Sequence, residues 1–113
     1  MTRHDDNVRL RHMLDYAQEA VAMMEGKTQA ELADNRVLQF ALARVVEIVG
    51  EAATRVSPET QRRLTRIPWP QVIALRNRLA HGYEAVDLGI LGEIVEMDLP
   101  PLICELRKDL DLE

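Results

Sequence analysis

The sequence predicts an all-α protein, and three features of its 113 residues support this prediction. Its apolar content, 47% of the chain, is mostly Ala, Val, Ile and Leu, with one Trp, one Phe and two Tyr. Gly and Pro are scarce, and no hairpin dipeptide lies between alternating apolar and polar residues. Apolar residues recur instead at the three- and four-residue spacing of helices. Because the length suits one hydrophobic core, we expect a single domain over residues 1–113, a compact bundle of four or five helices.

Two long helices are predicted in the first half of the chain. The first covers residues 8–25, where an Asp or Asn at positions 5–7 can cap its start and Gly26 can end it. Residues 28–31, Thr-Gln-Ala-Glu, have the form of a capping box and predict one short helical turn. The second long helix covers residues 35–56, and its apolar stripe is the longest uninterrupted one: Leu38, Ala41, Leu42, Val45, Ile48, Val49, Ala52 and Val56.

Shorter helices are predicted in the second half. Ser57 can cap a short arginine-bearing helix over residues 58–64, with proline at its first position. The next helix should cover residues 70–81, with Gly82 at the position that closes a helix.

A final pair of helices follows. Asp87 can cap a helix that Pro100 and Pro101 should kink or interrupt, and Pro101 can start a last helix that reaches Leu112.

Cysteine content and hydropathy predict the compartment. A lone cysteine, Cys104, rules out an internal disulfide and suits a reducing cytosol. Residues 1–6 hold no apolar signal segment, and no run of 18 apolar residues exists. We therefore expect a soluble cytoplasmic protein that does not enter a membrane.

Charge is unevenly distributed along the chain. The net charge is −5, but residues 55–78 contain six arginines and one acid, Glu59, so that segment carries +5 and the remainder −10. Because phosphate contacts dominate nucleic-acid binding, this basic segment could hold an anionic ligand. A solvated arginine face on a surface helix explains the same pattern equally well, and both interpretations stay open.

The most informative segment covers residues 76–83, Arg-Asn-Arg-Leu-Ala-His-Gly-Tyr. Arginine presents a planar fork of donors that suits phosphate oxygens, and histidine exchanges a proton near neutral pH. Together, Arg76 and His81 supply what cleavage of a phosphodiester without a metal needs. Asn77 lies four residues before His81, so the two can share a helix face and form a hydrogen bond.

Helix geometry can separate Arg76 from His81, and each of the two residues also has a non-catalytic interpretation. Arg76 and His81 are five residues apart, about 140° around a helix axis, so they share a face only if the helix ends near His81. A histidine at a helix C-terminus is also a common cap without catalytic meaning. Arg76 could likewise pair with a carboxylate such as Glu51 or Glu84.

These residues resemble a known family. The pattern Arg76-x4-His81-x-Tyr83 is similar to the R-x4-6-H signature of the HEPN superfamily, in the R-x4-H-x-Y form of the HepT-like ribonuclease toxins. Three further segments resemble that family in the same order: residues 43–53, residues 67–69 leading into the motif, and residues 98–100. One departure is Met97 with its two preceding residues, where many relatives carry an aromatic residue earlier in the helix.

The resemblance implies a homodimeric HEPN bundle that acts as the toxin of a toxin–antitoxin pair. It implies a metal-independent RNA endonuclease, directed at tRNA, without a cofactor, in which Arg76 and His81 are catalytic. Asn77, Arg78 and Glu51 are candidate supporting residues. It further implies that an MntA-like nucleotidyltransferase antitoxin silences the toxin by adding AMP to Tyr83, although a buried packing role would also suit a tyrosine there.

The other polar residues give weaker evidence of a functional site. Glu47 and Glu51 lie one turn apart among arginines, which favours a salt-bridged helix face over a metal site, although Glu51 could also orient the motif. His4 and His12 lack a third ligand, so we expect no metal site there. An alternative function also remains: a non-catalytic helical module that docks, or recruits substrate for, a partner nucleotidyltransferase.

Overall fold

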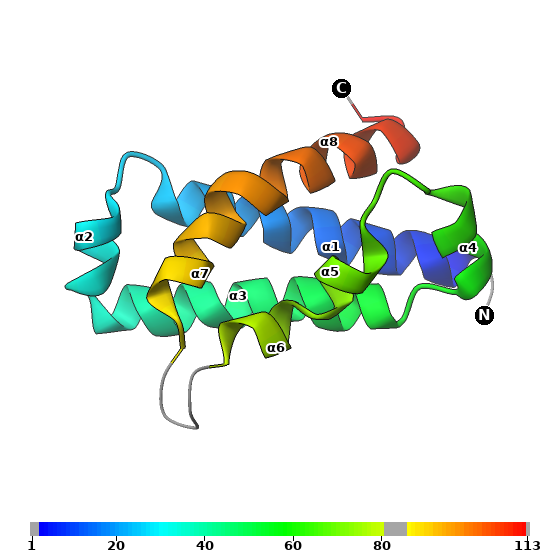
Figure 1. Cartoon of the computed structure of the whole chain (residues 1–113). Helices are drawn as coiled ribbons and strands as arrows, with labels where there is room; N and C mark the ends of the chain where they lie inside the picture. Colours follow the sequence, from blue (N-terminus) through cyan, green and yellow to red (C-terminus); the bar gives the residue numbers. More distant parts are fainter. Residues whose placement is uncertain (1–2, 81–85, 113) are drawn as a thin grey trace.

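The computed structural model describes residues 3–80 and 86–112, and these residues form helices joined by short turns. The predicted all-α fold is confirmed (Figure 1). Two antiparallel helices, α1 and α3, form the long axis, and α8 lies against α1. The helices are α1 (Arg3–Met24), α2 (Gln29–Ala33), α3 (Arg36–Thr54), α4 (Pro58–Arg63), α5 (Trp69–Ile73), α6 (Leu75–Leu79), α7 (Leu88–Glu93), the π-helix η1 (Ile94–Asp98) and α8 (Leu99–Asp109).

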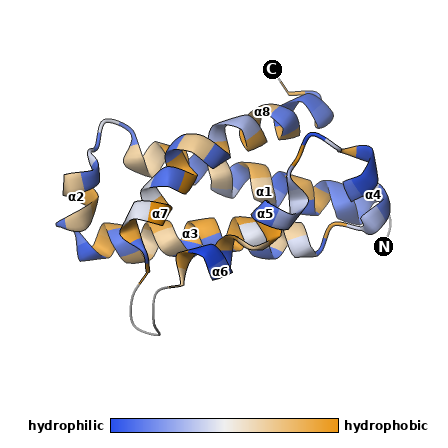
Figure 2. Cartoon of the chain, in the orientation of Figure 1, coloured by the Kyte–Doolittle hydropathy of each residue, from blue (hydrophilic) through white to orange (hydrophobic). Residues whose placement is uncertain are grey.

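The core lies between α1, α3 and the helices of the second half. Hydrophobic and hydrophilic residues alternate along most of the helices (Figure 2), and every helix except α4 contributes buried apolar residues to the core. The largest side chains with less than 2% exposure are Leu10, Met13, Leu14, Leu32, Leu42, Val46, Leu75, Leu79, Leu91, Ile94, Leu99 and Leu106. No helix in the described part of the chain is long and apolar enough to cross a membrane.

The start of α1 differs from the prediction. We expected an acid at positions 5–7 to cap a helix beginning near Val8, but α1 already begins at Arg3. Asp6 is instead 3% exposed, and its carboxylate accepts hydrogen bonds from the Ser57 backbone N–H (3.0 Å), the Ser57 hydroxyl (2.6 Å) and the Thr60 hydroxyl (2.6 Å). Asp6 thus ties the beginning of α1 to the start of α4.

The predicted helix over residues 70–81 is divided in the structure. α5 ends at Ile73, Ala74 leaves helical geometry with ψ near 5°, and α6 then runs only from Leu75 to Leu79. Ala80 is extended, and the Asp87 backbone N–H donates to the Leu79 carbonyl at 2.9 Å. The helix therefore ends two residues before His81, and His81 itself lies outside the described residues.

Close packing against α3 positions this divided helix. A Cβ placed on Gly50 would lie 3.1 Å from the Val72 carbonyl oxygen and 3.4 Å from Leu75 Cβ. A Cβ at this position would require its neighbours to move by a few tenths of an ångström, so glycine suits this close approach of α3 and α5. At the other end of α5, the Trp69 indole is 6% exposed and donates to the Leu64 carbonyl at 3.1 Å, which holds the start of α5 in the core.

The two consecutive prolines lie just after a π-helical segment. Pro100 and Pro101 occupy the first turn of α8, where the fixed φ of proline is compatible with helical geometry. The chain enters this turn from η1, a single π-helical segment that continues directly from α7. The chain therefore continues as helix from Leu88 to Asp109, with a local change of winding at the place where we expected a kink.

Candidate active site

The described part of the motif lies on α6. Leu75 and Leu79 are each 1% exposed and fix this short helix to the core, since they are four residues apart on one face. The residues between them therefore face outward or sideways: Arg76 and Asn77 are exposed, and Arg78 is partly buried. His81 and Tyr83 lie outside the described residues, so their geometry relative to α6 stays a prediction.

Arg78 is held by a residue far away in the sequence. Its Nη1 donates to Oδ2 of Asp98 at 2.5 Å, and the two side chains are 28% and 32% exposed. Asp98 is the last residue of η1, so this ion pair joins the motif helix to the α7–α8 segment. The resemblance had drawn attention to residues 98–100, but no local spacing in the sequence predicts the pair, since 20 residues separate the partners.

Arg76 lies on the opposite side of α6. The two arginines are two residues apart, about 160° around the helix axis. Since Arg78 faces η1, Arg76 points away from η1. Within residues 3–80 and 86–112, no hydrogen bond or ion pair holds the Arg76 guanidinium, so it is exposed and available to an anion.

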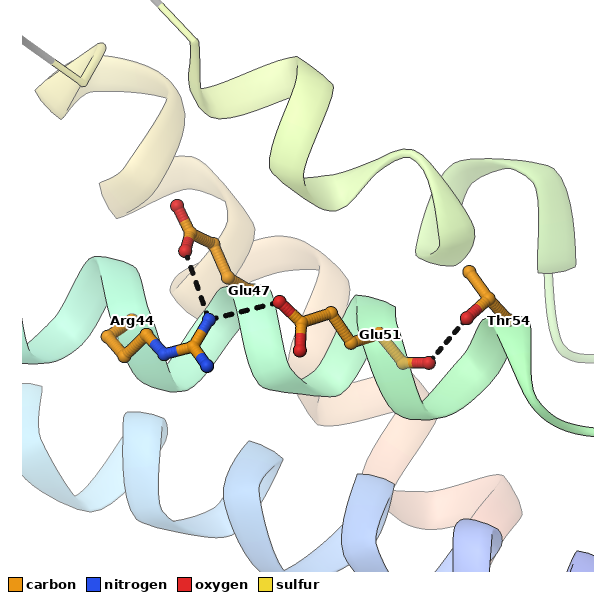
Figure 3. A network of polar contacts seen from close by, with 4 residues as sticks. All are labelled: Arg44, Glu47, Glu51 and Thr54. Carbon is orange, nitrogen blue, oxygen red and sulfur yellow. Dashed lines mark hydrogen bonds and ion pairs between the residues drawn. The ribbon is translucent and has the colours of Figure 1, made fainter.

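Glu51 does not contact Arg76 in this structure. Arg44 Nη1 lies 3.0 Å from Oε1 of Glu51, two turns along the same helix, and 3.5 Å from Oε1 of Glu47, one turn along it (Figure 3). The hydrogen bond that Arg44 donates to Glu51, with a smaller contribution from Glu47, raises the pKa of Arg44. The predicted salt-bridged helix face is therefore present, and Arg44 is its centre. Because the side chain of Glu51 contacts Arg44, a role for Glu51 in supporting the motif stays a hypothesis.

The electrostatics of this region follow from these pairs. Arg78 is compensated by Asp98, and both acids on the outer face of α3 share Arg44. Arg76 remains as an exposed cation in the first turn of α6 without a compensating acid among the described residues. This arrangement can bind a phosphate and offset negative charge that develops on it.

Comparison with known proteins identifies the family. A family model described as ribonuclease HepT-like matches residues 13–108. A protein of Methanocaldococcus jannaschii named "Putative RNase" is 27% identical over 107 residues, which cover 95% of this chain and 98% of the relative. A second protein of that organism, named "Gamma-glutamylcyclotransferase and putative RNase", is 32% identical over 106 residues that make up 48% of its length.

A further relative carries the family name itself. The "Probable ribonuclease HepT" of Thermococcus cleftensis is 36% identical over 70 residues, 62% of this chain and 64% of the relative. No solved structure matches the chain. The region matched by the family model, residues 13–108, includes the whole segment from Arg76 to Tyr83 and all of the helices from α2 to η1. This protein therefore belongs to the HepT-like ribonuclease family of HEPN proteins.

Proposed function

We propose that this protein is the toxin of a toxin–antitoxin pair and acts as a metal-independent RNA endonuclease, with tRNA as the expected target. The observation that carries the proposal is Arg76, an exposed arginine without an ion-pair partner among the described residues, in a chain of the HepT-like ribonuclease family. Its neighbour Arg78 is held by Asp98, so the motif contains one fixed arginine and one available arginine.

The proposed reaction needs only groups of the motif. The ribose 2′-oxygen forms a bond to the adjacent phosphorus while the bond from phosphorus to the 5′-oxygen breaks, which gives a 2′,3′-cyclic phosphate and a free 5′-hydroxyl. His81 takes the proton from the 2′-hydroxyl or supplies one to the leaving oxygen, a role typically worth about 10²–10⁴-fold in rate. Arg76 binds the phosphate and offsets the charge on its non-bridging oxygens. Asn77, on the outer face of α6, would orient the histidine.

The proposal includes a homodimer, for which an apolar surface on α3 gives support. Val37 and Phe40, at the beginning of α3, are 78% and 58% exposed, although both are large hydrophobic residues. Arg36 lies over the Phe40 ring, 4.9 Å from its centroid. α6 packs against α3 and runs toward this end of it (Figure 1). A second copy on this surface would bring two motifs close together, so that Arg76 of one chain could act beside His81 of the other.

Control by an antitoxin is the regulatory part of the proposal. An MntA-like nucleotidyltransferase would add AMP to Tyr83, two residues after the histidine. The added phosphate would place negative charge beside the RNA-binding arginines and repel the substrate. Intact-mass analysis after co-expression with such an enzyme should show one or more added AMP groups on the peptide that contains Tyr83. An unmodified peptide in an active complex would contradict this part.

Cleavage by the purified chain tests the central proposal. Labelled tRNA should be cut in the presence of EDTA, and the products should carry 2′,3′-cyclic phosphate and 5′-hydroxyl ends. Loss of cleavage under chelation would refute the metal-independent mechanism. Stable binding of a nucleotidyltransferase without any RNA cleavage would instead favour the non-catalytic binding module.

A further inference from the structure

A cationic groove lies between α1 and α3, separate from the motif. Its volume is about 310 Å³, within the range of small-ligand sites. The lining residues are Arg9 and His12 from α1, and Ile48, Glu51, Ala52 and Arg55 from the last turns of α3. Ile48 and Ala52 form the apolar floor, and the polar side chains surround it.

The charge of the groove favours an anion. Arg9 and Arg55 each contribute a positive charge, whereas the charge of Glu51 is compensated by Arg44 at 3.0 Å. Neither groove arginine has an ion-pair partner among residues 3–80 and 86–112. His12 is exposed and can donate a hydrogen bond whether or not it is protonated. The groove therefore holds two uncompensated guanidinium groups and a further donor.

Arg9 is partly enclosed by the protein. Its Nε is buried and has no hydrogen-bond partner among the described residues, and leaving a buried donor unpaired costs about 1–3 kcal/mol. A ligand in the groove does not reach this buried atom. The two terminal nitrogens are not among the buried unpaired atoms, so they are the donors that can bind a phosphate oxygen there.

The groove lies across α3 from Arg76. A Cβ on Gly50 would be 3.4 Å from Leu75 Cβ, so Leu75 and the adjoining Arg76 are level with the middle of the α3 segment that lines the groove. α3 separates α1 from α5 and α6, as Figure 3 shows around the Arg44–Glu51 pair. The groove and Arg76 are therefore about one helix diameter apart, about 10 Å. A single RNA strand can span that distance.

We propose that the groove of Arg9, His12 and Arg55 binds a backbone phosphate of the RNA substrate, away from the bond that is cut. This inference rests on the proposed function, because it assigns a second contact to the same substrate. The groove holds the strand on one side of α3 while Arg76 holds the reacting phosphate on the other. Substrates long enough to reach both positions therefore bind more tightly than short ones.

Salt-dependent RNA binding by the full-length protein tests the groove. The probe is a fluorescent 12-nucleotide 2′-O-methyl RNA, which lacks the attacking hydroxyl and stays intact. Fluorescence anisotropy compares the wild type with Arg9→Gln/Arg55→Gln and with a control, Arg11→Gln/Lys27→Gln. The control removes two exposed basic side chains that lie outside the groove. Circular dichroism confirms folding, and Arg55→Gln alone changes only an exposed side chain.

The expected result separates the two pairs of variants. Each lost phosphate contact lowers the salt slope for a single strand by about 0.7, so the groove pair should lower it by about 1.4 and weaken binding about tenfold. The single variant should lower the slope by about half as much, and the control pair should not change it. Equal slopes for groove and control variants would overturn the proposal, as would a wild type that does not bind the probe.

Light scattering and cleavage kinetics separate the groove proposal from the proposed nuclease function. If light scattering shows that the groove variants change the oligomeric state, the groove is an interface between copies and the proposal fails. With cleavable RNA, the groove variants should raise KM about tenfold for a 12-mer, change it little for a trinucleotide, and leave kcat within about twofold. A wild type that binds the probe but cuts no RNA would refute the proposed function while the groove assignment stands.

Discussion

The ion pair between Arg78 and Asp98 should hold the motif helix in place, and replacing Asp98 with Asn tests this. The side chains are 28% and 32% exposed, so the pair is intermediate between a surface salt bridge, about 0–1 kcal/mol, and a buried charged hydrogen bond, about 1.5–3 kcal/mol. The direct Coulomb attraction between two unit charges about 4 Å apart is about 4 kcal/mol at an effective dielectric of 20. Desolvation and screening offset most of this attraction. We therefore expect Asp98→Asn to lower the free energy of unfolding by about 1–2 kcal/mol.

Urea unfolding and cleavage kinetics measure the two consequences. A loss of 1–2 kcal/mol should lower the urea midpoint by about 0.5–1 M at the slopes typical of small domains. Because α6 is only five residues long and Arg78 fixes one side of it, kcat should also fall, with KM little changed. A double-mutant cycle with Arg78→Gln should give a coupling energy of at least about 0.5 kcal/mol.

A second ion pair provides the control. Arg63 and Asp109 also lie 2.5 Å apart, with side chains 42% and 13% exposed, but they join α4 to α8 away from the motif. Their hydrogen bond raises the pKa of Arg63 despite partial burial. Asp109→Asn should destabilise the protein by a similar amount and leave kcat unchanged. Equal effects of the two variants on kcat, or no coupling between Arg78 and Asp98, would refute the positioning role.

The remaining predictions concern the stability of the protein and the chemistry of RNA cleavage. Asp6→Asn should lower the free energy of unfolding by about 2–4 kcal/mol, because Ser57 and Thr60 lose a charged acceptor; an unchanged urea midpoint would contradict this. Burial favours a higher pKa for Asp6, but the hydrogen bonds from Ser57 and Thr60 lower it below its ordinary 3.8. The difference between wild type and variant should therefore be full above pH 4 and disappear as the pH falls through the lowered pKa; a difference that persists in acid would refute the assignment. Gly50→Ala should destabilise the protein by about 1–3 kcal/mol in thermal unfolding, because its Cβ would meet the Val72 carbonyl at 3.1 Å, and a neutral substitution would show that α5 can move away. RNA cleavage should persist in EDTA at an undiminished rate, and recovery of lost activity by an added divalent cation would exclude the mechanism.

The sequence predicted those parts of the fold that local chemistry determines. Thr28, Ser57 and Asp87 each accept a hydrogen bond from a backbone N–H of the first helical turn, as predicted. Asn35 caps α3 in the same way, although we expected it to be the first residue of that helix. The predicted boundaries of α3 and α4 are correct to within two residues. Caps can be recognised because both partners lie within a few residues of each other.

Tertiary contacts explain the features that were missed. Asp6 was one of three candidates, with Asp5 and Asn7, to cap α1, but it accepts hydrogen bonds from Ser57, 51 residues away. The division at Ala74 and the π-turn before Pro100 depend on how α5 and α8 fit against the core. The spacing of apolar residues within those segments does not reveal how they pack against the core.

The candidate site was predictable to a similar extent. The motif arginines could be identified by residue type and spacing, and the family match now covers them. Which arginine is available depends on a long-range ion pair, because Asp98 compensates Arg78 and leaves Arg76 exposed. The groove of Arg9 and Arg55 could not be anticipated, since it forms only when α1 packs against the end of α3.

Induced expression of the chain in growing cells tests the central claim most directly. The wild type, Arg76→Ala, His81→Ala and the surface control Arg11→Ala are compared for growth, and their small RNAs are separated on a gel. The wild type and Arg11→Ala should stop growth and produce new RNA fragments, whereas Arg76→Ala and His81→Ala should do neither. Normal growth and intact RNA with all four proteins would contradict the nuclease and leave the binding module as the better explanation.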